Sequence, residues 1–554
     1  MSAVSRSRAR KAALELLGVL TVVLMVCRNH YDIITVRDVG ADDEGWYLAS
    51  GVLLGKPGFP NGPDGWPIPE QGPLYCLWYG VLSKLVSNPL DLYFANWQIL
   101  ISALSIMLFL IVRRYGVAYW QALLASFFFV NGLVADIWPF PTYFATLIVL
   151  LGIFITTFVR PPKRAFLVVV VTLGVAGFAR PELLWAYAVA VMAYLTCASL
   201  NARRTKKLSE LIPTAAISLL PGIVLSSIFG NPLGGTRAFF AFAQHYAKGL
   251  LDERHSSLDP WANWGEITEH DFLGAKTIAQ AMWANPKAFS EHVFRNLHQF
   301  PESFLRVSST LLDTSSAIQK LLQSLGILFA LIQIIFILRS RTSIALRRVL
   351  FFVIGCLSLP FSLSCVLVNP RLHYFIPIYT LTLILVFSRP VKLPVMFWRK
   401  AHVLLTGAFS AALVFLTASK NGAATLTEWL TRHHRAAPIE VFGDRQKAIL
   451  YLRGLNLRNP IVTLEYSWGT CFYAGYSCNS YLRWDKQMPL HEFVTSLQVN
   501  LLIFDDTIQN DVRFVNDPDV NDFIHDAGRF GFVSERVPGT AIWLVYRSRA
   551  RDTT

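Results

Sequence analysis

Charged residues are scarce in this sequence. Of its 554 residues only 16% are charged, whereas 53% are hydrophobic, and the chain contains 39 Phe and 15 Trp. A soluble protein of this length needs a more polar surface than such a composition supplies. The scarcity of charge therefore excludes an ordinary soluble enzyme and indicates an integral membrane protein.

Long polar intervals are also few, because apolar runs recur throughout the chain. A membrane-spanning helix needs about 17–25 mostly apolar residues. The runs predict eleven spans, at 12–28, 93–112, 117–136, 140–159, 165–179, 183–200, 208–229, 318–338, 349–368, 372–388 and 401–418. The first run also suits a cleaved signal peptide, but Cys27-Arg28-Asn29 is not a small-residue cleavage site, so we expect a retained span.

Acidic residues are missing from the short connections on one side of these spans. Those connections contain 21 Lys or Arg and no Asp or Glu; they are 1–11, 113–116, 160–164, 201–207, 339–348 and 389–400. Basic connections face the cytoplasm. We therefore predict a multi-pass protein of the cytoplasmic (inner) membrane, with a cytoplasmic N-terminus and an extracytoplasmic C-terminal segment. The rest of the chain carries 29 basic and 36 acidic residues, so the net charge of +14 reflects topology and gives no reason to expect nucleic acid as a partner.

Cysteine and nucleotide-binding motifs are sparse as well. Of the seven cysteines, five lie in or beside predicted spans, and only Cys471 and Cys478 fall in the exported segment, where a disulfide and two free thiols are both open. The sequence has no phosphate-binding P-loop, no Rossmann glycine fingerprint and no His-Glu-x-x-His zinc motif. A transferase whose site faces outward would therefore need a donor that is already activated and is carried by a lipid.

The sequence does contain three consecutive carboxylates, Asp42, Asp43 and Glu44, just beyond the first span. Trp46 and Tyr47 follow at once, and such aromatics anchor a loop at the level of lipid headgroups. Clustered carboxylates raise one another's pKa, which suits a general base that accepts a hydroxyl proton. The alternative interpretation is a solvated acidic loop.

Two arginines occupy tight turns that are predicted to face outward. Arg180 precedes Pro181-Glu182, and Arg371 follows Pro370. Two guanidinium groups on one face could bind a phosphate or pyrophosphate, and Glu182 could hold Arg180 in place. The alternative is that both side chains merely reach toward headgroup phosphates.

Weaker signals surround these turns. His373 and Tyr374 suit either the same site or an interfacial belt, and His245 lies in a second large outer loop, 230–317, where a structural role is the simpler interpretation. In the first outer loop, 28–92, the apolar stretch 74–86 is too short to span and predicts a helix in the membrane interface.

The C-terminal segment, 419–554, reads as a small α/β domain, and residues 1–418 form the membrane domain. Apolar runs at 461–464, 501–504 and 541–546 predict strands, and 443–453 and 489–498 predict helices between them.

The first periplasmic loop of GT-C glycosyltransferases resembles three segments here: Asp43-Glu44-Gly45-Trp46-Tyr47-Leu48, Leu53-Leu54-Gly55-Lys56 and Gly72-Pro73-Leu74-Tyr75. The branch with protein O-mannosyltransferases and the lipid A aminoarabinose transferase is the nearest. Ala179-Arg180-Pro181-Glu182 and Arg371-x-x-Tyr374-x-x-Pro377 extend the resemblance. An acidic triplet replaces the family's more usual pair.

The resemblance implies an eleven-span, GT-C-like helical membrane fold with a C-terminal extracytoplasmic domain. It implies transfer, with inversion, of a sugar from a polyprenyl-phosphate donor to a hydroxyl of a lipid, glycan or protein acceptor. Asp43 would be the general base, with Asp42 as its competitor, and Arg371 and Arg180 would bind the phosphate. Metal use varies in the family; no cofactor is certain, and a divalent metal is the open alternative.

Two other functions remain open at this point. A transporter or flippase would place polar residues through the whole bundle, whereas the charges here gather at its outer edge. An oligosaccharide polymerase or ligase would share the lipid-linked donor but would use Arg and His of a large loop, as His245 allows.

Overall fold

The computed structural model describes residues 3–309, 344–388, 402–417 and 442–547. Within these ranges it does not describe 31–32, 41–42, 59, 70–71, 161, 207–208, 210, 235–236, 257, 259, 456, 459, 467, 483, 485, 506–507, 509–513 and 515–516. Asp42, the predicted span 318–338 and residues 419–441 of the predicted C-terminal domain therefore lie outside the described residues.

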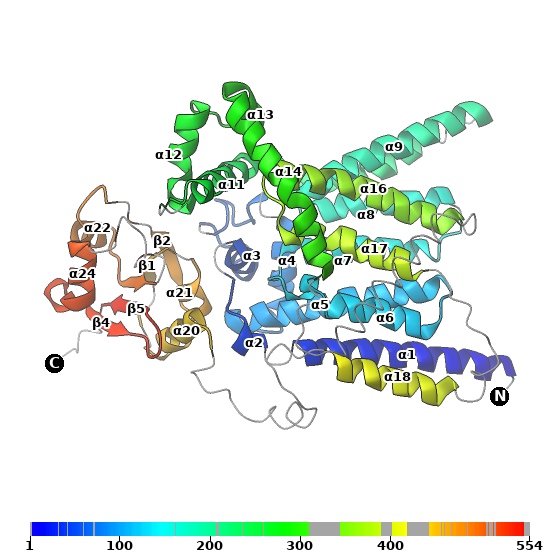
Figure 1. The fold of residues 1–554 in the computed structure, drawn as a ribbon, viewed down its shortest axis with the longest axis horizontal. Coiled ribbons are helices and arrows are strands. Elements are labelled where there is room, and N and C mark those ends of the chain that lie inside the picture. The colour runs from blue at the N-terminus through cyan, green and yellow to red at the C-terminus, as the bar shows by residue number, and fades with distance from the viewer. Residues whose placement is uncertain are drawn as a thin grey trace.

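A bundle of helices is the largest part of the described chain (Figure 1). Its members are α1 (Ala3–Asn29), α5 (Pro89–Arg114), α6 (Tyr119–Val130), α7 (Pro141–Thr156), α8 (Pro162–Gly177), α9 (Glu182–Thr205), α10 (Leu211–Phe229), α16 (Ile344–Leu367), α17 (Ile376–Phe387) and α18 (His402–Leu416). Each coincides with a predicted span. Among the described helices, five are long and apolar enough to cross a membrane (α1, α5, α9, α10 and α16), so the predicted total of eleven spans is not confirmed.

Local chemistry sets where the helices of the bundle begin. Pro89 and Pro141 are the first residues of α5 and α7, where the missing N–H of proline costs no helical hydrogen bond. Asn88 caps α5, because its side-chain oxygen accepts hydrogen bonds from the backbone N–H groups of Leu90 and Asp91 at 3.0 and 3.2 Å. At the other end of α5, Arg113 pairs with Glu15 of α1 at 2.8 Å and joins the two helices.

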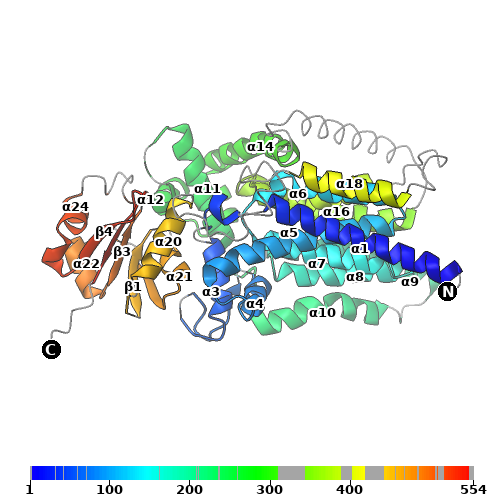
Figure 2. The ribbon, with the colours of Figure 1, turned by 90° about the horizontal axis from the view of Figure 1, so that it is seen from below.

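Further helices gather at the end of the bundle where the C-terminal sheet lies, here called the sheet end (Figures 1 and 2). They are α2 (Ile33–Val36), α3 (Asp43–Val52), α4 (Pro73–Leu82), α11 (Arg237–Glu253), α12 (Pro260–Phe272), α13 (Ile278–Ala284) and α14 (Pro286–Ser309), with the 3-10 turns η2 (Leu133–Asp136) and η5 (Leu372–Phe375). Helix α4 overlaps the predicted interfacial stretch 74–86.

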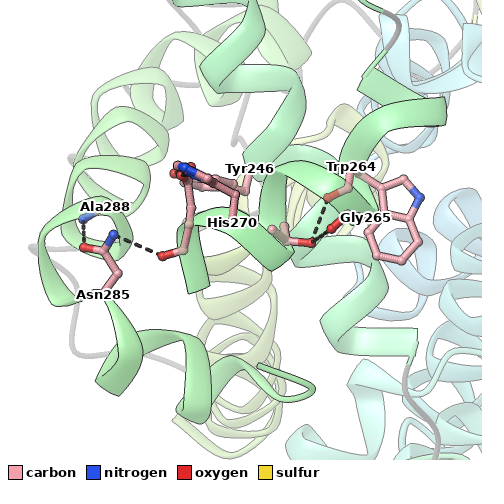
Figure 3. A network of polar contacts seen from close by, with 8 residues as sticks. Tyr246, Trp264, Gly265, His270, Asn285 and Ala288 are labelled. Carbon is pink, nitrogen blue, oxygen red and sulfur yellow. Dashed lines mark hydrogen bonds and ion pairs between the residues drawn. The ribbon is translucent and has the colours of Figure 1, made fainter. Parts of the chain in front are cut away.

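Polar contacts join helices α11 to α14 into one unit (Figure 3). Tyr246 of α11 donates a hydrogen bond to Asp271 of α12 at 2.6 Å, and His270 contacts the same carboxylate at 2.8 Å. The side-chain nitrogen of Asn285, just before α14, donates to the backbone oxygen of Asp271 at 3.1 Å. Beneath these contacts, Phe242 packs on Phe272 and other aromatic rings. The unit fixes α11, whose first residue reaches the site described below.

The C-terminal region is an α/β domain, as predicted. Its five-stranded sheet has the order β2-β1-β3-β5-β4, in which β1 is parallel to β2 and β3, and β5 is antiparallel to β3 and β4. The strands are β1 (Ile461–Glu465), β2 (Cys478–Leu482), β3 (Leu501–Phe504), β4 (Val533–Arg536) and β5 (Trp543–Tyr546). The helices are α20 (Asp444–Gly454), α21 (Thr470–Tyr473), α22 (Leu490–Ser496), α24 (Pro518–His525) and the 3-10 turn η8 (Ala527–Phe530).

Alternate side chains of β3 pack into two different hydrophobic cores, one on each face of the sheet. Leu501 and Ile503 belong to the core that continues into the helix bundle, whereas Leu502 and Phe504 belong to a second core under α22 and α24. Successive side chains of a strand point to opposite faces, so a fully apolar strand needs cover on both. The Cys471–Cys478 disulfide, left open by the sequence, links α21 to β2 in this domain.

The C-terminal domain is bound to the segment that leads into α3. Asp38 accepts a hydrogen bond from the backbone N–H of Arg445 at the start of α20, at 3.3 Å. Tyr473 of α21 donates to the carbonyl of Gly40 at 3.4 Å, and the N–H of Gly40 donates to Tyr93 of α5 at 3.0 Å. The segment 37–40 is thus held by the bundle and by the domain together.

Glu465, at the end of β1, should make the domain sensitive to pH. Burial raises the pKa of this carboxyl from its ordinary 4.5 to about 7, although the backbone N–H of Thr470 donates to it at 2.8 Å. Between pH 4.5 and 7 the folded state keeps a proton that the unfolded state has lost, so stability falls as the pH rises through this window. We expect Glu465→Gln to stabilise the domain above pH 7 by about 3 kcal/mol.

Amide hydrogen exchange of β1 and β3, corrected for the intrinsic exchange rate, would measure this effect between pH 5 and 8. The exposed Glu492 of α22 offers a matched control. The Glu492→Gln protein should show the same pH dependence of hydrogen exchange as the parent protein. An identical pH dependence in the Glu465→Gln protein would show that Glu465 is not responsible.

Candidate functional site

A pocket of about 480 Å³ lies at the sheet end of the bundle, where four segments meet. These segments are α3, the turn between α8 and α9, the start of α11, and the end of α16 with η5. Its polar lining comprises Asp43, Tyr47, Arg180, Glu182, Arg237, Ser364, Arg371, His373 and Tyr374. The pocket therefore brings together Asp43, Arg180 and Arg371, which the sequence predicted to share a site.

Helix α3 decides which carboxylate of the acidic triplet reaches the pocket. Successive residues of a helix point about 100° apart, so Asp43 and Glu44 cannot share a direction, whereas Asp43 and Tyr47 lie one turn apart on the same face. Asp43 and Tyr47 line the pocket. Glu44 is buried instead beside Gly40, outside the pocket lining. Asp42 lies outside the described residues.

Asp43 forms an ion pair with Arg237, the first residue of α11. The Nη2 atom of Arg237 donates to Oδ1 of Asp43 at 2.6 Å. Burial alone would raise the pKa of the Asp43 carboxyl, but Arg237, followed by Arg371 and Arg180, outweighs it and lowers the pKa. The expectation that clustered carboxylates raise this pKa is therefore wrong for Asp43, because the groups that act on it are cationic.

Arg180 is fixed by its own turn, as predicted. Its Nη2 atom pairs with Glu182 at 2.7 Å, and its side chain is only 12% exposed. Its guanidinium lies 5.5 Å from the centre of the Tyr374 ring. Burial would lower the pKa of Arg180, but Glu182 and other nearby groups raise it, so the side chain stays charged. The buried Nε–H of Arg180 has no hydrogen-bond partner among the described residues.

Backbone contact with the first outer loop also holds the Arg180 turn. The N–H of Leu74 donates to the carbonyl of Phe178 at 3.1 Å. Gly72 adopts a left-handed φ of 75°, and a Cβ added there would lie 2.2 Å from the carbonyl oxygen of Ala179. Only glycine allows this approach.

Arg371 is the least constrained arginine of the pocket. Its backbone is set by two hydrogen bonds: its N–H donates to Asn369 at 2.8 Å, and its carbonyl accepts from Tyr374 at 3.0 Å. Among the described residues, its guanidinium forms no ion pair or side-chain hydrogen bond. An uncompensated guanidinium beside a second one, Arg180, is suited to binding an anion such as a phosphate.

The two histidines differ in their relation to the pocket. His373 lines it, is 3% exposed, and stacks on Phe140 with ring centres 4.3 Å apart. Its Nε2 atom has no hydrogen-bond partner among the described residues. His245 lies outside the lining, with its Nδ1 atom 3.1 Å from the side-chain nitrogen of Asn369. Burial, helped by Arg371, lowers the pKa of His245 to about 3, so it is neutral.

One wall of the pocket is apolar and reaches the side of the bundle. It is formed by Trp185 of α9 and by Pro360, Leu363 and Leu367 of α16, two helices that pack on each other. The side chain of Trp185 is 60% exposed and that of Leu363 is 48% exposed. Large exposed apolar residues on a membrane helix are the surface that contacts lipid, so the pocket borders that surface.

No group of three or more His, Cys, Asp or Glu that could hold a metal occurs within the part of the chain that the structure describes.

The sequence analysis did not predict Arg237 as a residue of the site. A signal was present in the sequence, because Arg237 is the only charged residue between positions 230 and 247.

Sequence comparisons find no protein similar to this chain, whereas a structural comparison finds similar solved structures. No protein-family model matches it, and no curated protein does. Among solved structures it is similar to the archaeal oligosaccharyltransferase AglB from Archaeoglobus fulgidus, in complex with an inhibitory peptide and a dolichol-phosphate. The identity is 11%, the TM-score is 0.44, and the match covers 97% of this chain and 75% of that chain.

Proposed function

We propose that this protein is a membrane glycosyltransferase that moves a sugar from a polyprenyl-phosphate donor to an acceptor hydroxyl, with inversion at the sugar. The observation that carries this proposal is one pocket in which a carboxylate, Asp43, faces the arginines Arg180 and Arg371 beside an apolar wall. A lipid-linked donor has the same three parts: a reacting sugar, a phosphate and a hydrocarbon tail.

The charges of the pocket favour a donor with a single phosphate. Arg180, Arg237 and Arg371 bring three positive charges, and Asp43 and Glu182 bring two negative ones, so these five side chains carry a net charge of +1. A sugar phosphodiester carries one negative charge and would be neutralised, whereas a pyrophosphate diester carries two. Guanidinium groups also match the geometry of phosphate oxygens.

The apolar wall gives the donor tail a path. Trp185 and Leu363 line the same pocket as the arginines and are also exposed on the surface of α9 and α16. A polyprenyl chain could then stay in the bilayer while its phosphate rests against Arg371. This route needs no movement of lipid through the bundle.

In the proposed reaction, Asp43 accepts the proton of the acceptor hydroxyl as that oxygen attacks the anomeric carbon. The bond between that carbon and the phosphate oxygen breaks, and its electron pair leaves with the polyprenyl phosphate. Arg371 and Arg180 stabilise the negative charge that builds on this leaving group, a contribution that is large in a site shielded from water. Direct displacement inverts the configuration.

We also propose the arrangement in the membrane. The basic connections of the bundle would face the cytoplasm, and the pocket and the C-terminal domain, predicted to begin at residue 419, would lie on the extracytoplasmic side of the inner membrane. The C-terminal domain contacts the segment that precedes Asp43, so it is the natural place for the acceptor to bind.

The two alternative functions find less support in the pocket. For a flippase, the lining would have to continue through the bundle, but among the described residues it takes in only the first turn of α9 and the last turns of α16 from the bundle helices. For a polymerase or ligase that relies on His245, the histidine would have to face the donor, and it lies outside the lining.

Radiolabelled donors would test the proposed function. We expect the full-length protein in liposomes to transfer label from a polyprenyl-phosphate sugar to an acceptor in a membrane extract, and not from the matching pyrophosphate or nucleotide sugar. A panel of sugars would identify the one transferred. Failure to consume any polyprenyl-phosphate sugar, in protein that still unfolds cooperatively on heating, would contradict the proposal.

A further inference from the structure

The ion pair between Asp43 and Arg237 blocks the carboxylate that the proposed reaction needs. We propose that Arg237 moves from Asp43 to the donor phosphate when the donor binds, so that the donor itself frees the base. This inference rests on the proposed function. It adds that Arg237 pairs first with Asp43 and then with the donor phosphate. It assigns Arg237 to the phosphate site together with Arg180 and Arg371.

The pair is accessible enough to exchange. The Asp43 side chain is 42% exposed and that of Arg237 is 49% exposed, and both line the pocket. Ion pairs in contact with water are weak, because each charge is solvated when the pair opens. An incoming phosphate, with several acceptor oxygens for a guanidinium, can therefore displace the single carboxylate.

The other two arginines cannot play this part. Arg180 is tied to Glu182 in its own turn and is largely buried, and Arg371 pairs with no carboxylate within the part of the chain that the structure describes. Arg237 also begins α11, and Ala238 and Ala241 of the same helix line the pocket. The positive end of a 17-residue helix adds to the attraction for an anion at this position.

A second feature of the pocket points to an anion there. The Nε atom of Arg180 and the Nε2 atom of His373 are buried without a partner among the described residues. Buried polar atoms of this kind normally have a hydrogen-bond partner, and a ligand would supply one. Both atoms belong to residues that line the same pocket as Arg237.

The exchange of partners by Arg237 would require the donor to bind before Asp43 can act as a base. While Arg237 is paired, Asp43 is a weak base because cationic neighbours stabilise its ionised form. Loss of that partner makes the carboxylate more basic at the time when the sugar is in place. An acceptor or a water molecule that enters the empty pocket would find no effective base.

A double-mutant cycle on ligand binding would test the exchange. Undecaprenyl phosphate would be titrated against the full-length protein in detergent, with tryptophan fluorescence as the readout, since Trp185 lines the pocket. The four proteins are the parent, Asp43→Asn, Arg237→Gln and the double variant. We expect Asp43→Asn to tighten binding about tenfold in the parent, because Arg237 no longer has to leave a partner, and Arg237→Gln to weaken it about tenfold.

The sign of the coupling decides between exchange and a fixed pair. If Arg237 moves, Asp43→Asn tightens binding clearly more in the parent than in the Arg237→Gln protein. If Arg237 stays on Asp43, its loss exposes an unpaired carboxylate to the phosphate, and Asp43→Asn then helps equally or more in the Arg237→Gln protein. That second pattern would overturn the inference while leaving the proposed function intact.

Two controls complete the test. Undecaprenol, which lacks the phosphate, should bind all four proteins alike. Asp252→Asn removes the carboxylate of a second ion pair on α11, formed with Lys248 outside the pocket lining, and should leave binding unchanged. Failure of the parent protein to distinguish undecaprenyl phosphate from undecaprenol would remove the proposed function and this inference together.

Discussion

Asp43→Ala should lower the rate of sugar transfer by roughly a thousandfold, within the range of about 10²–10⁴ that a positioned general base contributes. Among the described residues of the lining, Glu182 is the other carboxylate, and it is paired with Arg180. The loss should be in kcat, because the donor phosphate and tail keep their own contacts. Transfer from a radiolabelled polyprenyl-phosphate sugar at saturating donor would measure it.

Three further substitutions sharpen the assignment. Asp64→Ala removes an exposed carboxylate of the same outer loop and should leave kcat unchanged. Glu44→Gln removes a buried carboxylate outside the pocket lining, so any loss should follow reduced thermal stability. Asp42→Ala tests the remaining member of the triplet. Full activity in the Asp43→Ala protein would mean that another residue is the base.

Arg371→Ala should give the second-largest loss, about a hundredfold or more in kcat, which is the usual cost of removing one donor to a developing negative charge. Arg371 is the arginine of the pocket that neither Asp43 nor Glu182 neutralises through an ion pair. Its charge is therefore fully available to the leaving phosphate. Arg371→Lys should recover part of the rate, since it restores the charge without the two-pronged geometry.

Arg254, an exposed residue just after α11, is the matched control, and Arg254→Ala should not change the rate. The experiment should also record product inhibition by polyprenyl phosphate, which should weaken in the Arg371→Ala protein. A variant that loses activity but keeps the affinity of the parent for polyprenyl phosphate would place Arg371 away from the phosphate.

The sequence predicted the helices better than the contacts between them. Ten of the predicted spans coincide with described helices, because a run of apolar residues is a local signal. Within the C-terminal domain, β3 was predicted from Leu501–Phe504, all of which are buried. The strands β2 and β4 were missed because Cys478–Leu482 and Val533–Arg536 mix polar and apolar residues at the edges of the sheet.

The sequence predicted several residues of the site but not the ion pair of Asp43 or the direction in which its pKa shifts. Asp43, Arg180 and Arg371 were singled out from their turns and share a pocket. The direction in which the pKa of Asp43 shifts was not predictable, because it depends on Arg237, which lies 194 positions away in the chain. Local sequence also could not separate Asp43 from Glu44, because the choice depends on the rotation of α3 against its neighbours.

The hydrogen bonds that join segment 37–40 to α20 and α21 constrain how the sequence of the C-terminal domain can change. The near side of the C-terminal domain, with Arg445 and Tyr473, contacts the segment that leads into α3 and Asp43, so substitutions there would disturb the pocket. The far side, under α22 and α24, belongs to a separate core and touches none of these contacts. Under the proposed function, a change of acceptor would therefore be expected on that distant side, where substitutions leave the contacts of segment 37–40 intact.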